Sequence, residues 1–84
     1  MRSLLVTGGA GFIGANFVHY WIDRYPDDRI IVLDALTYAG NRANLESVED
    51  KPVFRFVHGD ILDGHLIRRL MREEKIDTIV HFAA

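Results

Sequence analysis

The hydrophobic and polar residues of this chain form two kinds of pattern, which follow one another along the sequence. Short runs that are continuously or nearly continuously apolar are typical of strands buried on both faces of a parallel sheet. They occur at residues 3–7, 29–34, 53–58 and 78–82. Longer segments with apolar residues at helical spacing separate them, at residues 12–24 and 64–74. The pattern therefore predicts strands joined by crossover helices.

Each predicted helix has one apolar side. In 12–24 that side comprises Ile13, Phe17, Val18, Trp21 and Ile22. In 64–74 it comprises Leu66, Ile67, Leu70 and Met71. We expect Phe17 and Trp21 to pack on the sheet rather than to bind a cofactor. The charged residues of the second helix are predicted to form a solvated face: Arg68, Arg69, Arg72, Glu73 and Glu74.

The least regular segment is 35–52. A connection of this length in a small domain usually has a function or contains a short helix. We expect a turn near Gly40 and a helix over 42–48 that begins after Asn41 as N-cap. Asp63 is the corresponding N-cap candidate for the helix at 64–74.

This order of elements predicts an α/β fold of the Rossmann type, with helices on both faces of a parallel sheet. Parallel strands require crossovers, and the strand order expected for such a unit is 3-2-1-4. In these sheets the carboxyl ends of the strands meet at one edge, and ligands bind beyond it. Ligand-binding residues are therefore expected directly after each strand.

Three glycines follow the first strand, in the pattern Gly8-x-x-Gly11-x-x-Gly14. Glycine permits positive φ and leaves space for a ligand to approach the backbone. The first N–H groups of the following helix would face a dinucleotide diphosphate at the positive end of the helix dipole. The alternative is a purely structural glycine-rich turn. A Walker phosphate loop is excluded because no Gly-Lys-Ser/Thr follows.

Acidic and small residues follow the other strands. Asp34 lies 20 residues after Gly14, where a carboxylate binds both ribose hydroxyls and repels a 2′-phosphate. This position favours NAD over NADP. After the third strand, Asp60 is placed to accept from the adenine amino group while Ile61 packs on the ring; the alternative for Asp60 is a turn or cap before the next helix. At the end of the fourth strand, in the segment 82–84, small residues would let the backbone approach the cofactor; the alternative is that this segment simply ends a sheet edge.

Composition limits the remaining possibilities. The chain has 84 residues, 49% of them hydrophobic and 26% charged, which describes at most one small soluble domain. A net charge of −2 without charge runs argues against nucleic acid or a membrane as partner. Neither cysteine nor a signal or membrane segment occurs, so we expect a cytoplasmic protein.

The sequence contains no candidate catalytic or metal-binding residues. The four histidines, His19, His58, His65 and His81, lack metal-ligand spacing and are predicted to be structural or solvent-facing. No Tyr-x-x-x-Lys pair occurs, because Arg follows each tyrosine four residues later. We therefore predict no metal site and no catalytic residue in this chain.

Together these motifs resemble the extended short-chain dehydrogenase/reductase family. Its fingerprint corresponds to the segment 7–14, Thr-Gly-Gly-Ala-Gly-Phe-Ile-Gly. A narrower resemblance, to the dTDP-glucose 4,6-dehydratases within it, lies in 33–41, with Asn44-Leu45, 59–61 and 81–84. The likeness covers all 84 residues, which correspond to the amino-terminal part of the NAD-binding domain.

The resemblance implies specific cofactor contacts. Phe12 and Ile13 would contact the pyrophosphate, Asp34 to Thr37 the adenosine ribose, Asp60 and Ile61 the adenine, and Phe82 to Ala84 the nicotinamide side. The full set of expected NAD-binding residues is Gly8, Gly11, Phe12, Ile13, Gly14, Asp34, Ala35, Leu36, Thr37, Gly40, Asp60, Ile61, Phe82, Ala83 and Ala84. Ala35 departs from the family, because many relatives have Lys there.

The implied reaction converts dTDP-glucose to its 4-keto-6-deoxy product plus water by internal hydride transfer with bound NAD. The full-length enzyme is expected to be a homodimer. Two alternatives stay open: a related epimerase or dehydratase for UDP- or GDP-sugars, and a non-catalytic NAD-sensing module.

Overall fold

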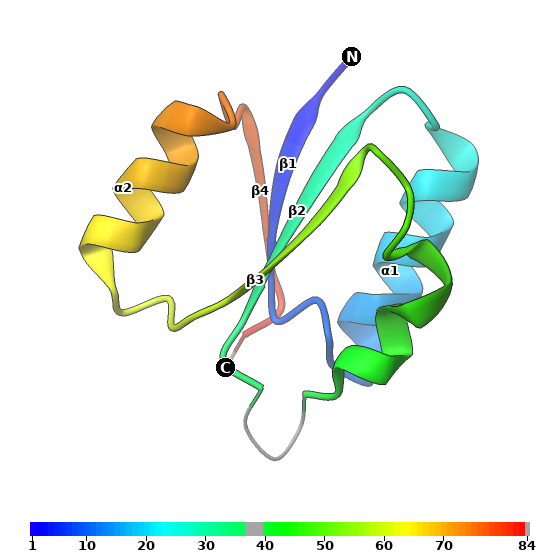
Figure 1. Ribbon diagram of the computed structural model, residues 1–84, viewed down its shortest axis with the longest axis horizontal. Coiled ribbons are helices and arrows are strands. Elements are labelled where there is room, and N and C mark those ends of the chain that lie inside the picture. The colour runs from blue at the N-terminus through cyan, green and yellow to red at the C-terminus, as the bar shows by residue number, and fades with distance from the viewer. Residues whose placement is uncertain (37–39, 84) are drawn as a thin grey trace.

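Four parallel strands form one sheet. The computed structural model describes residues 1–36 and 40–83. The strands are β1 (Ser3–Thr7), β2 (Arg29–Asp34), β3 (Phe54–His58) and β4 (Thr78–His81). Their order is β3-β2-β1-β4, which confirms the predicted topology (Figure 1). β3 begins one residue later than predicted and β4 ends one residue earlier.

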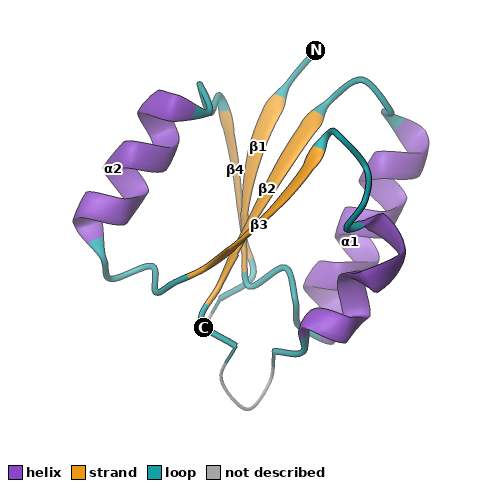
Figure 2. Ribbon diagram, in the orientation of Figure 1, coloured by secondary structure: helices purple, strands orange, loops and turns teal. Residues whose placement is uncertain are grey.

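The helices lie on both sides of the sheet (Figure 2). They are α1 (Phe12–Arg24), the 3-10 helix η1 (Arg42–Val48) and α2 (Gly64–Glu73). In Figure 1, α1 and η1 lie to the right of the sheet and α2 to the left. Both predicted N-caps are confirmed: Asn41 accepts from the Ala43 N–H at 3.0 Å and Asp63 from the Leu66 N–H at 3.1 Å.

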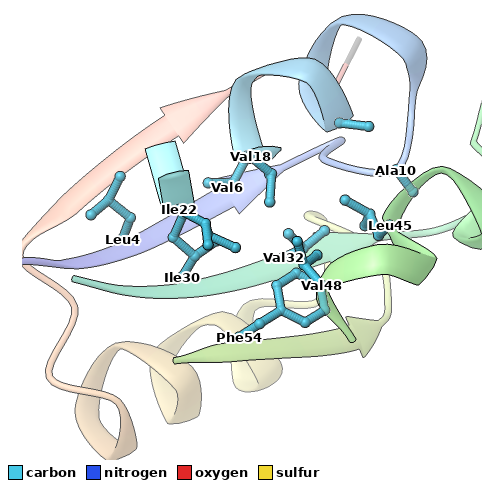
Figure 3. Packing of buried hydrophobic residues seen from close by; sticks show 11 residues of the cluster. Leu4, Val6, Ala10, Val18, Ile22, Ile30, Val32, Leu45, Val48 and Phe54 are labelled. Atoms are coloured by element: carbon cyan, nitrogen blue, oxygen red, sulfur yellow. The ribbon is translucent and has the colours of Figure 1, made fainter. Parts of the chain in front are cut away.

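Each face of the sheet has its own hydrophobic cluster. The larger one, under α1 and η1, contains Leu4, Val6, Val18, Ile30, Val32 and Leu45 among its buried members (Figure 3). The smaller one, under α2, contains Leu5, Ile31, Leu33 and Leu70. Successive strand residues point to opposite faces, so a strand covered on both sides needs apolar residues throughout. This packing accounts for the continuous apolar runs.

Two helix residues differ from their predicted environments. Ile13 is 70% exposed although it shares the helical spacing of the core residues, because the first turn of α1 packs through Gly14 and Ala15 instead. Glu74 was expected in solvent, which is wrong: it is buried and forms ion pairs with Arg29 and Arg55. Glu74 is the C-cap of α2, where the chain turns back towards the sheet.

The side chains of Phe17 and Trp21 pack on the larger cluster, as predicted. β4 is an edge strand of the sheet and leaves Ile79 54% exposed. Across residues 1–36 and 40–83, no helix has the length and apolar character that a bilayer span requires.

Candidate nucleotide-binding site

The first loop of the site is the glycine turn, residues 8–11, which connects β1 to α1. Gly8 has φ of +71°, in the left-handed region that glycine adopts without strain. Its N–H donates to the Leu33 carbonyl at 2.9 Å. A Cβ on Gly8 would lie 2.6 Å from the Ala83 nitrogen, so the end of β4 packs directly on this turn. A larger residue at position 8 would separate the two segments.

Gly14 brings α1 close to the same turn. A Cβ on Gly14 would lie only 2.3 Å from the Gly8 carbonyl oxygen. The first intrahelical hydrogen bond of α1 is donated by the Ala15 N–H to Gly11, its N-cap residue, at 2.8 Å. The N–H groups of Phe12, Ile13 and Gly14 precede that bond and have no acceptor within α1. These amides present partial positive charge at the carboxyl edge of the sheet.

Asp34 lies at the end of β2, beside the glycine turn. The residue is 9% exposed, and its carboxylate already accepts two backbone hydrogen bonds, from Ala10 to Oδ2 at 2.9 Å and from Leu36 to Oδ1 at 2.8 Å. Each carboxylate oxygen has two lone pairs, so each retains capacity for another donor. A Cβ on Gly40 would lie 2.7 Å from Oδ1, which shows how closely the following segment approaches the carboxylate.

The loop after β3 adjoins this group. The Gly59 N–H donates to the Asp34 carbonyl at 3.1 Å, which places Asp60 next to the β2 end. Asp60 is exposed, and its Oδ1 accepts from the Leu62 N–H at 2.9 Å. Asp60 therefore stabilises the turn, while Asp63 caps α2. Ile61 is half-buried against the cluster under α2, so only part of its side chain is available to a ligand.

The end of β4 forms the opposite side of the glycine turn. The Phe82 N–H donates to the Thr7 carbonyl at 2.8 Å, and the Phe82 ring lies 5.5 Å from that of Phe17. Next to it, Thr7 Oγ1 and His81 Nδ1 are hydrogen-bonded at 2.6 Å. Of the predicted site residues, Thr37 and Ala84, together with most of the expected turn near Gly40, lie outside the described residues.

The histidines have ordinary hydrogen-bond partners. His19 donates to the Asn44 carbonyl at 2.7 Å and His58 to the Ala35 carbonyl, through Nε2, at 3.0 Å. Within the described part of the chain, no three His, Cys, Asp or Glu side chains are grouped so that they could hold a metal ion.

Sequence reasoning missed the residues that hold the glycine turn from outside. The Ala10 carbonyl accepts from the Asn41 N–H at 3.0 Å and from the Asn44 side-chain amide at 2.9 Å. These partners lie more than 30 residues along the chain. Asn44 was noted only as part of a motif, and spacing alone contains no signal for its contact.

The chain matches proteins of known activity along almost all of its length. Its residues 5–84 match the model of the family described as GDP-mannose 4,6 dehydratase. A dTDP-glucose 4,6-dehydratase of Mycobacterium tuberculosis is 58% identical over 81 residues, which cover 96% of this chain and 23% of that protein.

Solved structures agree in sequence and shape. The crystal structure of dTDP-glucose 4,6-dehydratase from Bacillus anthracis in complex with NAD has a TM-score of 0.98 and 49% identity, covering 100% of this chain and 27% of that one. The enzyme from Streptomyces venezuelae, also with NAD bound, has a TM-score of 0.90 and 59% identity, covering 99% and 26%. This chain thus spans about a quarter of the length of these relatives. The predicted resemblance to dTDP-glucose 4,6-dehydratases is confirmed by these relatives, and the chain belongs to the family whose model is described as GDP-mannose 4,6 dehydratase.

Proposed function

We propose that residues 1–84 form the amino-terminal, NAD-binding part of a dTDP-glucose 4,6-dehydratase. The observation that carries this proposal is the arrangement at the carboxyl edge of the sheet. There, the Asp34 carboxylate accepts from the N–H of the buried Ala10, which precedes along the chain the α1 amides that have no helical acceptor. The relatives crystallised with NAD are about half identical to this chain or more, and share its backbone.

The residues present fit a dinucleotide. Side chains at Gly8 and Gly14 would collide with backbone, so the turn stays open and close to α1. The α1 amides that lack helical acceptors suit a diphosphate, and the remaining lone pairs of Asp34 suit two ribose hydroxyls. A 2′-phosphate would place negative charge against this carboxylate, so we propose a preference for NAD over NADP.

Roles follow the position of each segment along the edge. The turn and first helical residues hold the diphosphate, the segment after β2 the ribose, the loop after β3 the adenine, and the end of β4 the nicotinamide side. In that order the proposed contacts are Gly8, Gly11, Phe12, Ile13 and Gly14; Asp34, Ala35, Leu36, Thr37 and Gly40; Asp60 and Ile61; and Phe82, Ala83 and Ala84. Bound NAD supplies a reversible hydride acceptor for the sugar. The acid and base groups of the reaction are assigned to later parts of the parent protein.

The family model is named for a GDP-sugar enzyme, whereas the relatives above are named for dTDP-glucose. We propose dTDP-glucose as substrate because the relatives with 49–59% sequence identity are named for that sugar nucleotide. We also propose that the full-length enzyme is a cytoplasmic homodimer. We rank the epimerase and NAD-sensor alternatives below this proposal, because the relatives named above are dehydratases.

Calorimetric titration of the full-length protein with NAD and NADP tests cofactor binding. The same protein is then incubated with dTDP-glucose, UDP-glucose or GDP-mannose, and the products are analysed by mass spectrometry for loss of one water. We expect tighter binding of NAD and dehydration of dTDP-glucose. No NAD binding would refute the proposal, and dehydration of another sugar nucleotide alone would refute the substrate assignment.

A further inference from the structure

Ala10, in the middle of the glycine turn, is held at both of its backbone polar groups. Its N–H donates to Asp34 Oδ2 at 2.9 Å, and its carbonyl accepts from Asn44 Nδ2 at 2.9 Å and from the Asn41 N–H at 3.0 Å. The residue is fully buried. We call these three hydrogen bonds the Ala10 clamp. Asp34 is the last residue of β2, and both donors to the carbonyl come from the segment that follows β2.

The Ala10 clamp restrains the most adaptable part of the site. Ala10 is flanked by Gly9 and Gly11, and glycine loses more conformational freedom on ordering than any other residue. Bonds to both the N–H and the carbonyl fix the peptide planes on either side of Ala10. The Gly11 N–H shares the plane of the Ala10 carbonyl and donates to the Gly8 carbonyl at 3.2 Å. The amides of α1's first turn follow Gly11 directly, so their direction depends on these planes. Amides ordered in advance bind an anion without an added ordering cost.

Asn44 is itself held in place from several directions. It lies in η1, whose Leu45 is fully buried in the larger cluster with Ala10 (Figure 3). Its backbone carbonyl accepts from His19 of α1 at 2.7 Å. The Asn44 side-chain amide thus connects the glycine turn to η1, and η1 is in turn held by the burial of Leu45 and by the hydrogen bond from His19 of α1.

From this geometry we infer that Asn44 is a positioning residue for the diphosphate. By holding the Ala10 carbonyl, its side chain keeps the N–H groups of α1's first turn directed at the ligand, although Asn44 does not contact that ligand. The inference rests on the proposed NAD site and adds to it a residue that acts through the backbone. It also implies that Asp34 acts on two parts of the cofactor, on the ribose directly and on the diphosphate through Ala10.

The test compares Asn44→Asp with Ser47→Asp in the full-length protein. Asn44→Asp removes the donor and places an acceptor against the Ala10 carbonyl. Ser47 is exposed on the same helix, so Ser47→Asp adds the same charge without touching the Ala10 clamp. Calorimetry with NAD, ADP and adenosine separates diphosphate binding from nucleoside binding. We expect Asn44→Asp to weaken NAD and ADP about tenfold, as for a lost hydrogen bond in a preorganised site, and to leave adenosine unchanged.

A second measurement needs no ligand. Hydrogen–deuterium exchange of the peptide covering residues 8–14 should accelerate in Asn44→Asp and stay at the wild-type rate in Ser47→Asp. Equal losses for ADP and adenosine, or unchanged exchange in that peptide, would overturn the inference. A wild-type protein that binds no NAD would refute the proposed function instead, and the exchange data would then decide the Ala10 clamp alone.

Discussion

The two ends of the sheet hold their polar groups in different ways. At the amino ends of the strands, charged side chains pair with one another. Glu74, 8% exposed, lies between Arg29 at the start of β2 and Arg55 in β3. Ser3 in β1 donates its hydroxyl to the Glu74 carbonyl at 2.8 Å. The α2 C-terminus is thereby attached to three strands.

At the carboxyl ends, the Thr7 and His81 side chains bind each other, but the other polar side chains bind backbone groups. Asp34 accepts from two amides, Asn44 donates to a carbonyl, and Asp60 accepts from the Leu62 N–H. None of these contacts uses a cation, so the carboxylates keep capacity for a ligand's donors. At the amino-terminal edge of the sheet, which we call the closed edge, opposite charges neutralise one another. At the carboxyl edge, which we call the open edge, the polar groups are ordered but can still bind a ligand.

Separating α1 from the glycine turn at the open edge should have the largest effect on stability and NAD affinity. Gly14→Ala places a Cβ 2.3 Å from the Gly8 oxygen, a backbone atom that cannot swing away. We expect a loss of about 2 kcal/mol in unfolding free energy, despite alanine's helix propensity, and a fall in NAD affinity of more than about tenfold. Chemical denaturation and calorimetry measure the two effects.

Gly64→Ala is the matched control, because the nearest atom that its Cβ would meet is the flexible Arg68 guanidinium, at 3.3 Å. It should change stability by less than about 0.5 kcal/mol. Similar behaviour of the two variants would mean that α1 does not need its contact with the glycine turn.

The closed edge should affect stability without affecting the cofactor. Glu74→Gln removes the charge between two arginines that are themselves about half exposed, at 46% and 47%. We expect a loss of about 1–2 kcal/mol in unfolding free energy, less than for a fully buried pair, and an unchanged NAD affinity.

Glu73→Gln provides the comparison on the solvated side of α2. Its partner Arg69 is 3.9 Å away and both side chains are at least half exposed, so we expect a change below about 0.5 kcal/mol. A weakened NAD affinity in Glu74→Gln would show that the two edges are coupled.

Asp34→Ala should change selectivity at the open edge. The ratio of NAD to NADP affinity is expected to fall about tenfold, because the variant loses acceptors for the ribose and repulsion of a 2′-phosphate. Asp60→Ala, at the proposed adenine end, should weaken both cofactors alike. An unchanged ratio in Asp34→Ala, measured by calorimetry, would contradict the ribose assignment.

The smallest effect is expected from Asp28, also at the closed edge. The Arg2 N–H, at 2.8 Å, and the Trp21 indole lower the pKa of this carboxyl below its usual 3.8, against the opposing effect of burial. A lowered pKa in the folded state stabilises the protein above pH 3.8, and this contribution is lost as pH falls through the folded pKa. Asp28→Asn should therefore lower the melting temperature slightly at pH 7, and the difference from wild type should shrink as the pH falls below 3.8. A decrease that stays the same at pH 7 and below pH 3.8 would point to lost packing.

Most of the fold followed from local pattern. The bounds of α1, β1, β2 and η1, the two N-caps and the strand order were predicted correctly, because buried strands and capped helices have signals within a few residues. Glu74 was misplaced because its partners lie 45 and 19 residues away and its position at a C-cap has no periodic signal. Ile13 follows helical spacing but is exposed, because the first turn of α1 packs through Gly14 and Ala15.

The candidate site divides in the same way. Its glycines and Asp34 follow a spacing with a known physical reason, and the structure brings them together. In the Ala10 clamp, side chains 24 and 34 positions away bind the Ala10 amide and carbonyl, and the backbone N–H of Asn41 binds the same carbonyl. Such contacts depend on how a loop returns to the sheet, which hydrophobic pattern does not encode.

A crystal structure of the full-length protein with NAD tests the central claim most directly. The account predicts the diphosphate at hydrogen-bond distance from the Phe12 and Ile13 amides, with the adenosine ribose on Asp34. A dinucleotide bound away from the carboxyl edge, or a ribose without contact to that carboxylate, would contradict it.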